Sequence, residues 1–301
     1  MRFLCAFLLV ACSAVAAPDE VLQRSAATVL KVRAIARDTS VQLGSGVVLP
    51  GNKVAVTCHV TRDARRIEVI HGSRVLPAQS QVGSVSHDLC VLAVPGLEIA
   101  PAALRHSVTL RPGQQVFAAG FPEGGALAVS EGVVSGLHRA DGAWVIQTTA
   151  PFTFGASGGA LFDAAGQLVG ILAFKARSGG PLHFALPVDW ALDGSQVARR
   201  FEPVPGEGET RAFWELPKES QPGFLRAAVL EAAGNAQALA EWAEQRLAED
   251  PSDAGVWIAV GKAAAGIGNR ERALAAFSQA MRLEPDDPEA SHYLQRLGSR
   301  P

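Results

Sequence analysis

Three residues of the chain have types and an order that suit acyl transfer. They are a histidine, His59, an aspartate, Asp88, and a serine, Ser157. A serine hydroxyl is a weak nucleophile near neutral pH and needs an adjacent base, usually a histidine, to take its proton. The imidazole in turn needs a carboxylate on its second nitrogen, which fixes the tautomer and stabilises the imidazolium. We therefore predict a catalytic triad with His59 as general base, Asp88 as its orienting partner and Ser157 as nucleophile.

Glycines around the serine indicate a second part of the same chemistry. Ser157 lies in the stretch Gly155-Ala156-Ser157-Gly158-Gly159, and glycine adopts backbone angles that other residues avoid. Such a turn can aim backbone N–H groups at a developing oxyanion. We expect the N–H groups of Gly155 and Ser157 to form this oxyanion hole.

Short strands must position these residues. Between about residues 24 and 190, runs rich in Val, Leu, Ile and Ala alternate with turns of Gly, Pro, Asn and Asp, which predicts a β-sandwich or barrel. Pro187–Arg200 is predicted to be a closing helix. Strands are expected over Thr28–Ile35, Gly46–Leu49, Val54–Thr57, Arg66–Ile70, Leu89–Val94, Gln115–Ala119, Gly132–Leu137, Trp144–Thr149, Ala160–Phe162, Leu168–Phe174 and His183–Pro187.

The region Ser25–Leu192 resembles the trypsin-like serine peptidases of the HtrA (Deg) group. The resemblance rests on Gly44-Ser45-Gly46, on Thr57-Cys58-His59-Val60, on Asp88-Leu89-Cys90-Val91-Leu92 and on the glycine-rich turn around Ser157. The order His, Asp, Ser is also that of chymotrypsin. The resemblance implies a chymotrypsin-like all-β double barrel over residues 24–200 and serine-type endopeptidase activity. The departures are Cys58, Cys90, Ala156 and Ala160 at positions where the group usually has Asn, Ala, Asn and Pro; none removes a catalytic atom.

The two cysteines beside the triad predict a disulfide. Cys58 precedes His59 and Cys90 follows Asp88 by two residues, so a triad that brings His59 and Asp88 together also brings the cysteines together. An oxidising compartment would favour their pairing. Two free, buried thiols are the alternative.

A substrate pocket is predicted on the C-terminal side of the triad. Its residues are Phe154 before the serine turn, the strand positions Leu172, Ala173 and Phe174, and His183 on the next strand. The stretch before Gly155 holds no aspartate that would attract a basic side chain. We expect the pocket to accept small or medium apolar side chains at the position before the cleaved bond.

The N-terminus predicts export. Met1-Arg2 is followed by an apolar run and by small residues that end in an Ala-x-Ala-like site, so residues 1–17 are predicted to be a signal peptide. The alternative is a lipoprotein signal that leaves the chain anchored through Cys12. We expect a periplasmic or secreted protein with no transmembrane span. The formal net charge of −2 gives no basic surface for nucleic acid.

The C-terminal part has a different composition. Residues 201–222 are rich in Pro and Gly and are predicted to be a linker, in which Phe213 and Trp214 could dock on a domain surface. Residues 223–298 have helical periodicity and repeat after about 34 residues, which resembles the tetratricopeptide repeat. The matched pairs are Gly234-Asn235 with Gly268-Asn269, Gln245 with Gln279, and Pro251 with Pro285. This module stands where the HtrA group has a PDZ domain, so it is expected to bind substrate or a partner protein and to take no part in bond cleavage.

Two functions therefore compete on the sequence alone. The favoured one is an endopeptidase acting on protein or peptide substrates without a metal or other cofactor, because Cys and His residues lack zinc-site spacing. The other is an adaptor that binds partners through its helical repeats and keeps the peptidase fold as a scaffold. Esterase activity without peptide cleavage would use the same triad. The remaining histidines, His71, His87, His106, His138 and His292, are expected at turns or on the surface.

Overall fold

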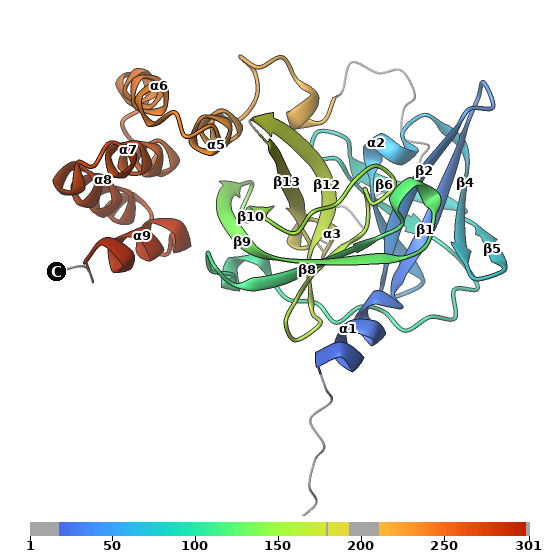
Figure 1. Cartoon of the computed structure of the whole chain (residues 1–301). Coiled ribbons are helices and arrows are strands. Elements are labelled where there is room, and N and C mark those ends of the chain that lie inside the picture. Colours follow the sequence, from blue (N-terminus) through green and yellow to red (C-terminus); the bar gives the residue numbers. More distant parts are fainter. Residues whose placement is uncertain (1–17, 179, 193–210, 299–301) are drawn as a thin grey trace, which may run out of the picture.

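The first β-unit of the chain is an open antiparallel sheet. We analysed a computed structural model, which describes residues 18–178, 180–192 and 211–298 (Figure 1). The strand order in this sheet is β5-β4-β1-β2-β3-β7-β6. The strands are β1 (Val29–Ala36), β2 (Val41–Leu49), β3 (Lys53–Thr57), β4 (Ala64–His71), β5 (Arg74–Pro77), β6 (Ser80–Ser84) and β7 (Leu89–Ala93).

The second β-unit is a closed barrel in the order β10-β13-β12-β11-β8-β9. Its interior is filled by fully buried side chains such as Leu161, Leu172 and Ile146, which alternate along the strands with residues of the opposite face. The strands are β8 (Gln115–Gly120), β9 (Ala128–Ala140), β10 (Ala143–Thr148), β11 (Ala160–Asp163), β12 (Leu168–Ser178) and β13 (Gly180–Pro187).

Short helices connect and flank the two β-units. α1 (Pro18–Ala26) leads into β1, and its Ser25 hydroxyl donates to the carbonyl of Gly166 in the second unit. α2 (Cys58–Thr61) follows β3 directly, and α3 (Asp189–Leu192) follows β13. Single 3-10 turns lie at η1 (Ser107–Thr109), η2 (Pro122–Gly124) and η3 (Phe213–Glu215).

The predicted chymotrypsin-like double-β fold is confirmed. Every strand expected from the sequence is present. The structure adds β5 and β6, which have four and five residues and no long apolar run. A closing helix was predicted over Pro187–Arg200, of which residues 187–192 are described. Pro187 ends β13, and Asp189–Leu192 form α3. The expected signal peptide at residues 1–17, with Cys12, lies outside the described residues.

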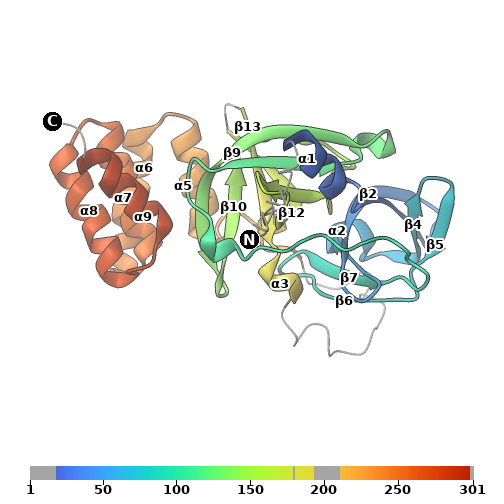
Figure 2. The ribbon, with the colours of Figure 1, turned by 90° about the horizontal axis from the view of Figure 1, so that it is seen from below.

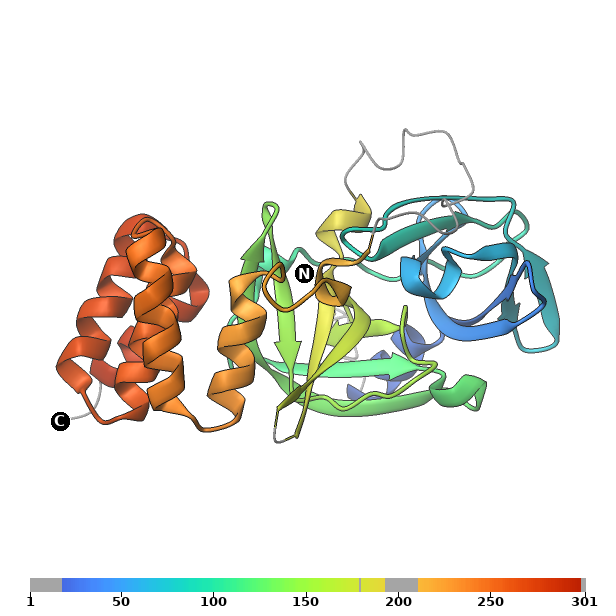
Figure 3. The same cartoon turned by 90° about the horizontal axis from the view of Figure 1, so that it is seen from above.

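Five helices follow as an all-helical domain, as predicted. Figures 2 and 3 show α5 lying between the barrel and the remaining helices, with α6 to α9 stacked beyond it. α5 packs on β12 and β13, and its Leu225 and Ala228 are buried in the same hydrophobic cluster as Phe174 and Phe184 of the barrel. The helices are α5 (Gly223–Ala232), α6 (Ala236–Glu249), α7 (Ala254–Gly266), α8 (Arg270–Leu283) and α9 (Pro288–Gly298).

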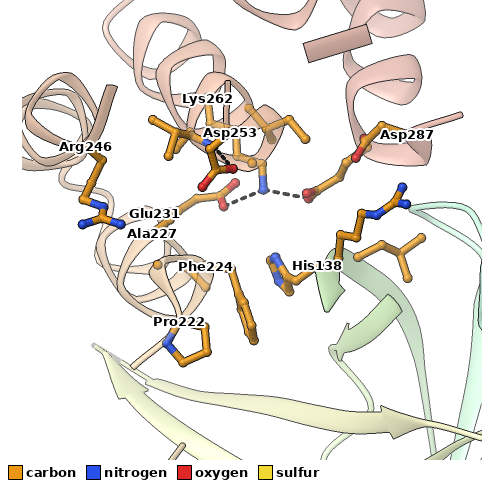
Figure 4. A pocket seen from close by; sticks show the side chains of 18 of the residues that line it. His138, Pro222, Phe224, Ala227, Glu231, Arg246, Asp253, Lys262 and Asp287 are labelled. Carbon is orange, nitrogen blue, oxygen red and sulfur yellow. Dashed lines mark hydrogen bonds and ion pairs between the residues drawn. The ribbon is translucent and has the colours of Figure 1, made fainter. Parts of the chain in front are cut away.

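A cavity of about 320 Å³ lies between the barrel and the helical domain (Figure 4). Lys262 is almost wholly buried there and forms ion pairs with Glu231 at 3.0 Å and Glu289 at 2.7 Å. Burial opposes the charge of Lys262, but the two carboxylates outweigh it and raise its pKa. The aromatic side of the cavity is made by His138, which stacks on Phe224 with ring centroids 4.7 Å apart.

His138 therefore corrects one expectation from the sequence. It is a buried residue of the domain interface, with 8% of its surface exposed, where a surface histidine was predicted. Burial lowers its pKa to about 4, and the nearby Lys262 acts in the same direction. The side chain that covers it, Phe224, comes from another domain, so the local sequence around His138 gives no sign of its burial.

No helix in the described part of the chain has the length and apolar character needed to cross a membrane.

Candidate active site

His59 and Asp88 are brought together by two neighbouring antiparallel strands. β3 pairs with β7 so that Thr57 lies opposite Leu89 and Val56 opposite Cys90. His59 is the second residue after β3 and Asp88 directly precedes β7, so both lie at the same end of the strand pair.

The disulfide closes this end of the strand pair. The predicted Cys58–Cys90 bond is present, with Cα atoms 5.0 Å apart, and both cysteines are fully buried. The backbone N–H of Cys58 also donates to the carbonyl of Asp88 at 3.0 Å. Covalent and hydrogen bonds thus fix the two triad loops to each other.

The His59–Asp88 pair has the geometry of an oriented general base. Asp88 Oδ2 lies 2.7 Å from His59 Nδ1, and Asp88 Oδ1 accepts the backbone N–H of His59 at 2.7 Å. Because a carboxylate only accepts, Nδ1 carries the proton and Nε2 is left to act as base. The Asp88 side chain is 1% exposed and that of His59 20%. Asp88 also adopts φ 58°, a backbone conformation that is uncommon outside glycine and that clusters at functional sites.

The turn around Ser157 can be built only with glycine at several positions. Gly155 and Gly158 both have φ 85°. A Cβ atom on Gly155 would lie 2.6 Å from the Phe121 carbonyl oxygen, and one on Gly158 would lie 2.1 Å from that of Ser45. In the described structure the N–H groups of Gly155 and Ser157 donate to no other protein group, which leaves them free for the predicted oxyanion hole.

Ser45 anchors this turn to the first β-unit. Its buried hydroxyl donates to the Gly155 carbonyl at 2.8 Å and accepts the N–H of Phe121 at 2.9 Å. Its own N–H donates to the Ser157 carbonyl at 2.8 Å. From the sequence, the Gly-Ser-Gly motif around Ser45 indicated only a family resemblance. In the structure, its serine holds the turn that contains Ser157.

The Ser157 hydroxyl makes no hydrogen bond to His59 in the part of the chain that the structure describes. Its Oγ donates instead to the Ala173 carbonyl at 3.2 Å. The Ser157 turn comes near α2 at Gly44, where an added Cβ would lie 2.8 Å from Val60 and 3.2 Å from the Ser157 carbonyl. Nucleophile–base contacts are often loose before substrate binds, so this arrangement is compatible with the predicted triad.

The predicted pocket residues lie in different surroundings. Ala173 and Phe174 are both buried, and the Ala173 carbonyl accepts the Ser157 hydroxyl, whereas the Leu172 side chain is in the barrel interior. Phe154 is 73% exposed, and the Lys175 ammonium lies 4.8 Å from its ring centre. His183 is buried with Nε2 3.1 Å from the Phe152 carbonyl, and burial lowers its pKa.

One residue next to the triad comes from the predicted linker. The Trp214 indole N–H donates to Asp88 Oδ2 at 3.1 Å, and the ring lies edge-on to His59 with centroids 5.4 Å apart. The sequence predicted that Phe213 and Trp214 could dock on a surface, but it gave no sign that they reach the triad, because the contact spans 126 residues.

The neighbouring Glu215 fixes this segment to α2. Its carboxylate accepts two bonds from Arg62, at 2.5 and 2.9 Å. Burial alone would raise the pKa of Glu215, but the bonds from Arg62 and from the N–H of Ala212 hold it below its usual value. The carboxylate therefore stays charged in its pair with Arg62.

The central part of the chain is similar to known peptidases. Residues 44–171 match the family described as the trypsin-like peptidase domain. This part of the chain is therefore similar to that domain. The chain is also homologous to the HtrA/DegP serine endoproteases. The "Probable periplasmic serine endoprotease DegP-like" of Pseudomonas savastanoi pv. phaseolicola is 37% identical over 160 residues, which cover 50% of this chain and 33% of that protein. The mitochondrial serine protease HTRA2 of Drosophila grimshawi is 31% identical over 159 residues, covering 49% and 37%.

Solved structures show the same relationship. The HtrA-type protease AlgW, crystallised with a tripeptide, superposes with a TM-score of 0.54 at 30% identity and covers 60% of this chain and 63% of its own. The Rv3671c protease from M. tuberculosis in its active form, at 24% identity and a TM-score of 0.55, shares the fold over 70% of this chain and 99% of its own. The chain spans about a third of the length of the curated relatives it matches, and each match covers about half of this chain.

Proposed function

We propose that this protein is an exported serine endopeptidase that cleaves peptide bonds through an acyl-enzyme intermediate. The observation that carries the proposal is the buried Asp88 carboxylate bonded to His59 Nδ1. Ser157 lies in a separate turn whose glycines have positive φ. A scaffold without catalytic activity would have no need of this arrangement.

In the proposed reaction Ser157 Oγ attacks the carbonyl carbon of the peptide bond while His59 Nε2 takes its proton. The N–H groups of Gly155 and Ser157 stabilise the oxyanion. His59 then returns the proton to the leaving amine, and an acyl group remains on Ser157. Water, activated by His59, hydrolyses this ester and restores the serine. Asp88 stays ionised throughout and stabilises the imidazolium.

We further propose a preference for small or medium apolar side chains before the cleaved bond. The strand that accepts the Ser157 hydroxyl at Ala173 offers uncharged side chains there. The Lys175 ammonium over Phe154 would repel a lysine or arginine side chain. The periplasmic names of the DegP-like relatives support an exported location.

The helical domain is proposed to be a tetratricopeptide-like module that binds substrate or a partner protein. Its two copies begin alike: Gly234 and Gly268 have positive φ, and Asn235 and Asn269 each cap the next helix with their side chains. Those helices, α6 and α8, have the same length of 14 residues. Such equivalence at matched positions is what a helical repeat requires.

Cleavage of unfolded casein by the wild type and by Ser157→Ala tests the proposal. We expect the variant to lose activity by several orders of magnitude, because removing a triad member removes most of the chemistry. Sequencing of the products would show whether apolar residues precede the cleaved bonds. A Ser157→Ala protein that cleaves casein at the wild-type rate, or a wild type that hydrolyses esters but no peptide, would contradict the proposed function.

A further inference from the structure

The Asp88 carboxylate has three donors, and one of them comes from outside the β-units. Oδ1 accepts the backbone N–H of His59, while Oδ2 accepts both His59 Nδ1 at 2.7 Å and Trp214 Nε1 at 3.1 Å. A buried carboxylate needs such donors to remain charged. Trp214 therefore shares the oxygen that orients the general base.

The Trp214 ring also contacts the surroundings of the reacting groups. It lies edge-on to the His59 imidazole at an interplanar angle of 88° and stacks on Phe174, with centroids 5.1 Å apart and an angle of 11°. Phe174 follows Ala173, whose carbonyl accepts the Ser157 hydroxyl. One indole thus touches the base, its carboxylate and the strand beside the nucleophile.

The segment that carries Trp214 is fixed to both triad loops. Glu215 pairs with Arg62 at the end of α2, the helix that contains His59. The N–H of Phe213 donates to the Ser86 carbonyl at 2.9 Å, just before Asp88. On its other side, Gln221 donates to the carbonyl of Trp214 at 2.9 Å. Figure 3 shows this short stretch of chain lying between the two β-units, above the barrel.

We propose that Trp214 is a positioning residue of the triad: its indole N–H holds the Asp88 carboxylate, and through it the His59 imidazole, in the geometry needed for proton transfer. The inference rests on the proposed peptidase function. It makes part of the chain between the β-units and the helical domain a support of the catalytic apparatus, where a linker with two docking aromatic residues was predicted.

Two full-length variants test this role. Trp214→Phe keeps an aromatic ring and removes the N–H donor, and replacement of Trp214 by 3-benzothienylalanine keeps the bicyclic shape and removes only the N–H. Trp190→Phe is the matched control, because the Trp190 N–H donates to the Asp141 carbonyl and its ring packs on His87, so it contacts neither Asp88 Oδ2 nor the His59 ring. Peptide hydrolysis is measured from pH 5 to 9, together with the rate of Ser157 labelling by a fluorophosphonate.

We expect kcat to fall about tenfold in both Trp214 variants, because the Asp88 carboxylate loses a hydrogen bond. KM should change less than about threefold, because this bond does not contact the substrate. The acidic limb of the pH profile should move to higher pH, since a carboxylate with one donor fewer stabilises the imidazolium more strongly. Trp190→Phe should match the wild type.

The outcomes separate this inference from the proposed function. If the wild type is active and both Trp214 variants keep its kcat and pH profile, the inference is overturned and the proposed function stands. If the variants lose activity only in proportion to lost folded protein, with an unmoved pH profile, Trp214 is structural and the inference is also overturned. A folded wild type that neither labels nor cleaves would contradict the proposed function, and the inference would fall with it.

Discussion

At the scale of residues, the candidate site is held together by single buried polar side chains. Asp88 accepts the backbone N–H of His59 and binds its Nδ1. Ser45 likewise holds the Ser157 turn by donating to the Gly155 carbonyl. Both side chains are buried. A buried polar group that lacks a hydrogen-bond partner lowers the free energy of unfolding by about 1–3 kcal/mol. The site therefore depends on residues that never touch a substrate as much as on the nucleophile itself.

Ser45→Ala should weaken the nucleophile turn in particular. The Gly155 carbonyl and the Phe121 N–H would both lose their partner, so we expect the free energy of unfolding to fall by about 1–3 kcal/mol. Displacement of the turn should slow fluorophosphonate labelling of Ser157 by roughly 10- to 100-fold. Ser40→Ala, at an exposed hydroxyl, is the control and should change stability by less than about 0.5 kcal/mol. Equal labelling rates in the two variants would contradict the role given to Ser45.

At the scale of elements, the β3–β7 strand pair determines where the base and its carboxylate lie. The pairing of Val56 with Cys90 makes the disulfide a direct consequence of strand register. The same register places His59 and Asp88 at one end of the pair, so a shift of one residue would separate them.

Removing the disulfide with the double variant Cys58→Ala/Cys90→Ala should lower the free energy of unfolding by about 4 kcal/mol, the loop-closure value for a loop of this length. Denaturant unfolding of the wild type and the variant, each with and without reductant, measures the effect. Reductant should destabilise the wild type alone. A double variant as stable as the oxidised wild type would show that the bond adds no stability.

Most of the strands were predictable from the sequence because each has its own local apolar run. His59, Asp88 and Ser157 each lie in a short motif that predicts the role proposed for it, and the structure brings His59 and Asp88 into contact. The Cys58–Cys90 bond was predictable because it follows from the approach of these two residues.

Trp214 and His138 were not predictable in this way. Trp214 lies in a segment rich in Pro and Gly whose composition is that of a linker, and its partner Asp88 is 126 residues away. His138 lies near the end of β9, where a polar side chain usually faces water, and Phe224 of α5 covers it. Both contacts are made between units, and no local pattern encodes them.

At the scale of the whole molecule, the helical domain is joined to the barrel by a buried interface. Leu225 and Ala228 of α5 lie in one cluster with Phe174 and Phe184 of the barrel, and Arg139 of β9 pairs with Glu284 at 3.2 Å. Because Phe174 also supports Trp214, the interface and the triad share a layer of aromatic side chains.

His138 should make this interface sensitive to acid. Its pKa of about 4 lies below the ordinary value of 6.5 because of burial, so the unfolded chain takes up a proton first and stability is lost as pH falls from about 6.5 toward 4. From pH 7 to pH 5, the free energy of unfolding of the wild type should therefore fall by about 2 kcal/mol more than that of His138→Phe. Denaturant titrations at both pH values measure it. A difference that does not vary with pH would mean that His138 is not held neutral.

The central claim is that Ser157 is a nucleophile activated by His59, and covalent labelling tests it most directly. The folded full-length wild type, Ser157→Ala and His59→Ala are treated with a fluorophosphonate, and the modified peptide is identified by mass spectrometry. We predict one adduct on Ser157 in the wild type, none at any residue in Ser157→Ala, and labelling slowed by orders of magnitude in His59→Ala. A folded wild type that is unlabelled at Ser157, or a His59→Ala variant labelled as fast as the wild type, would contradict the account.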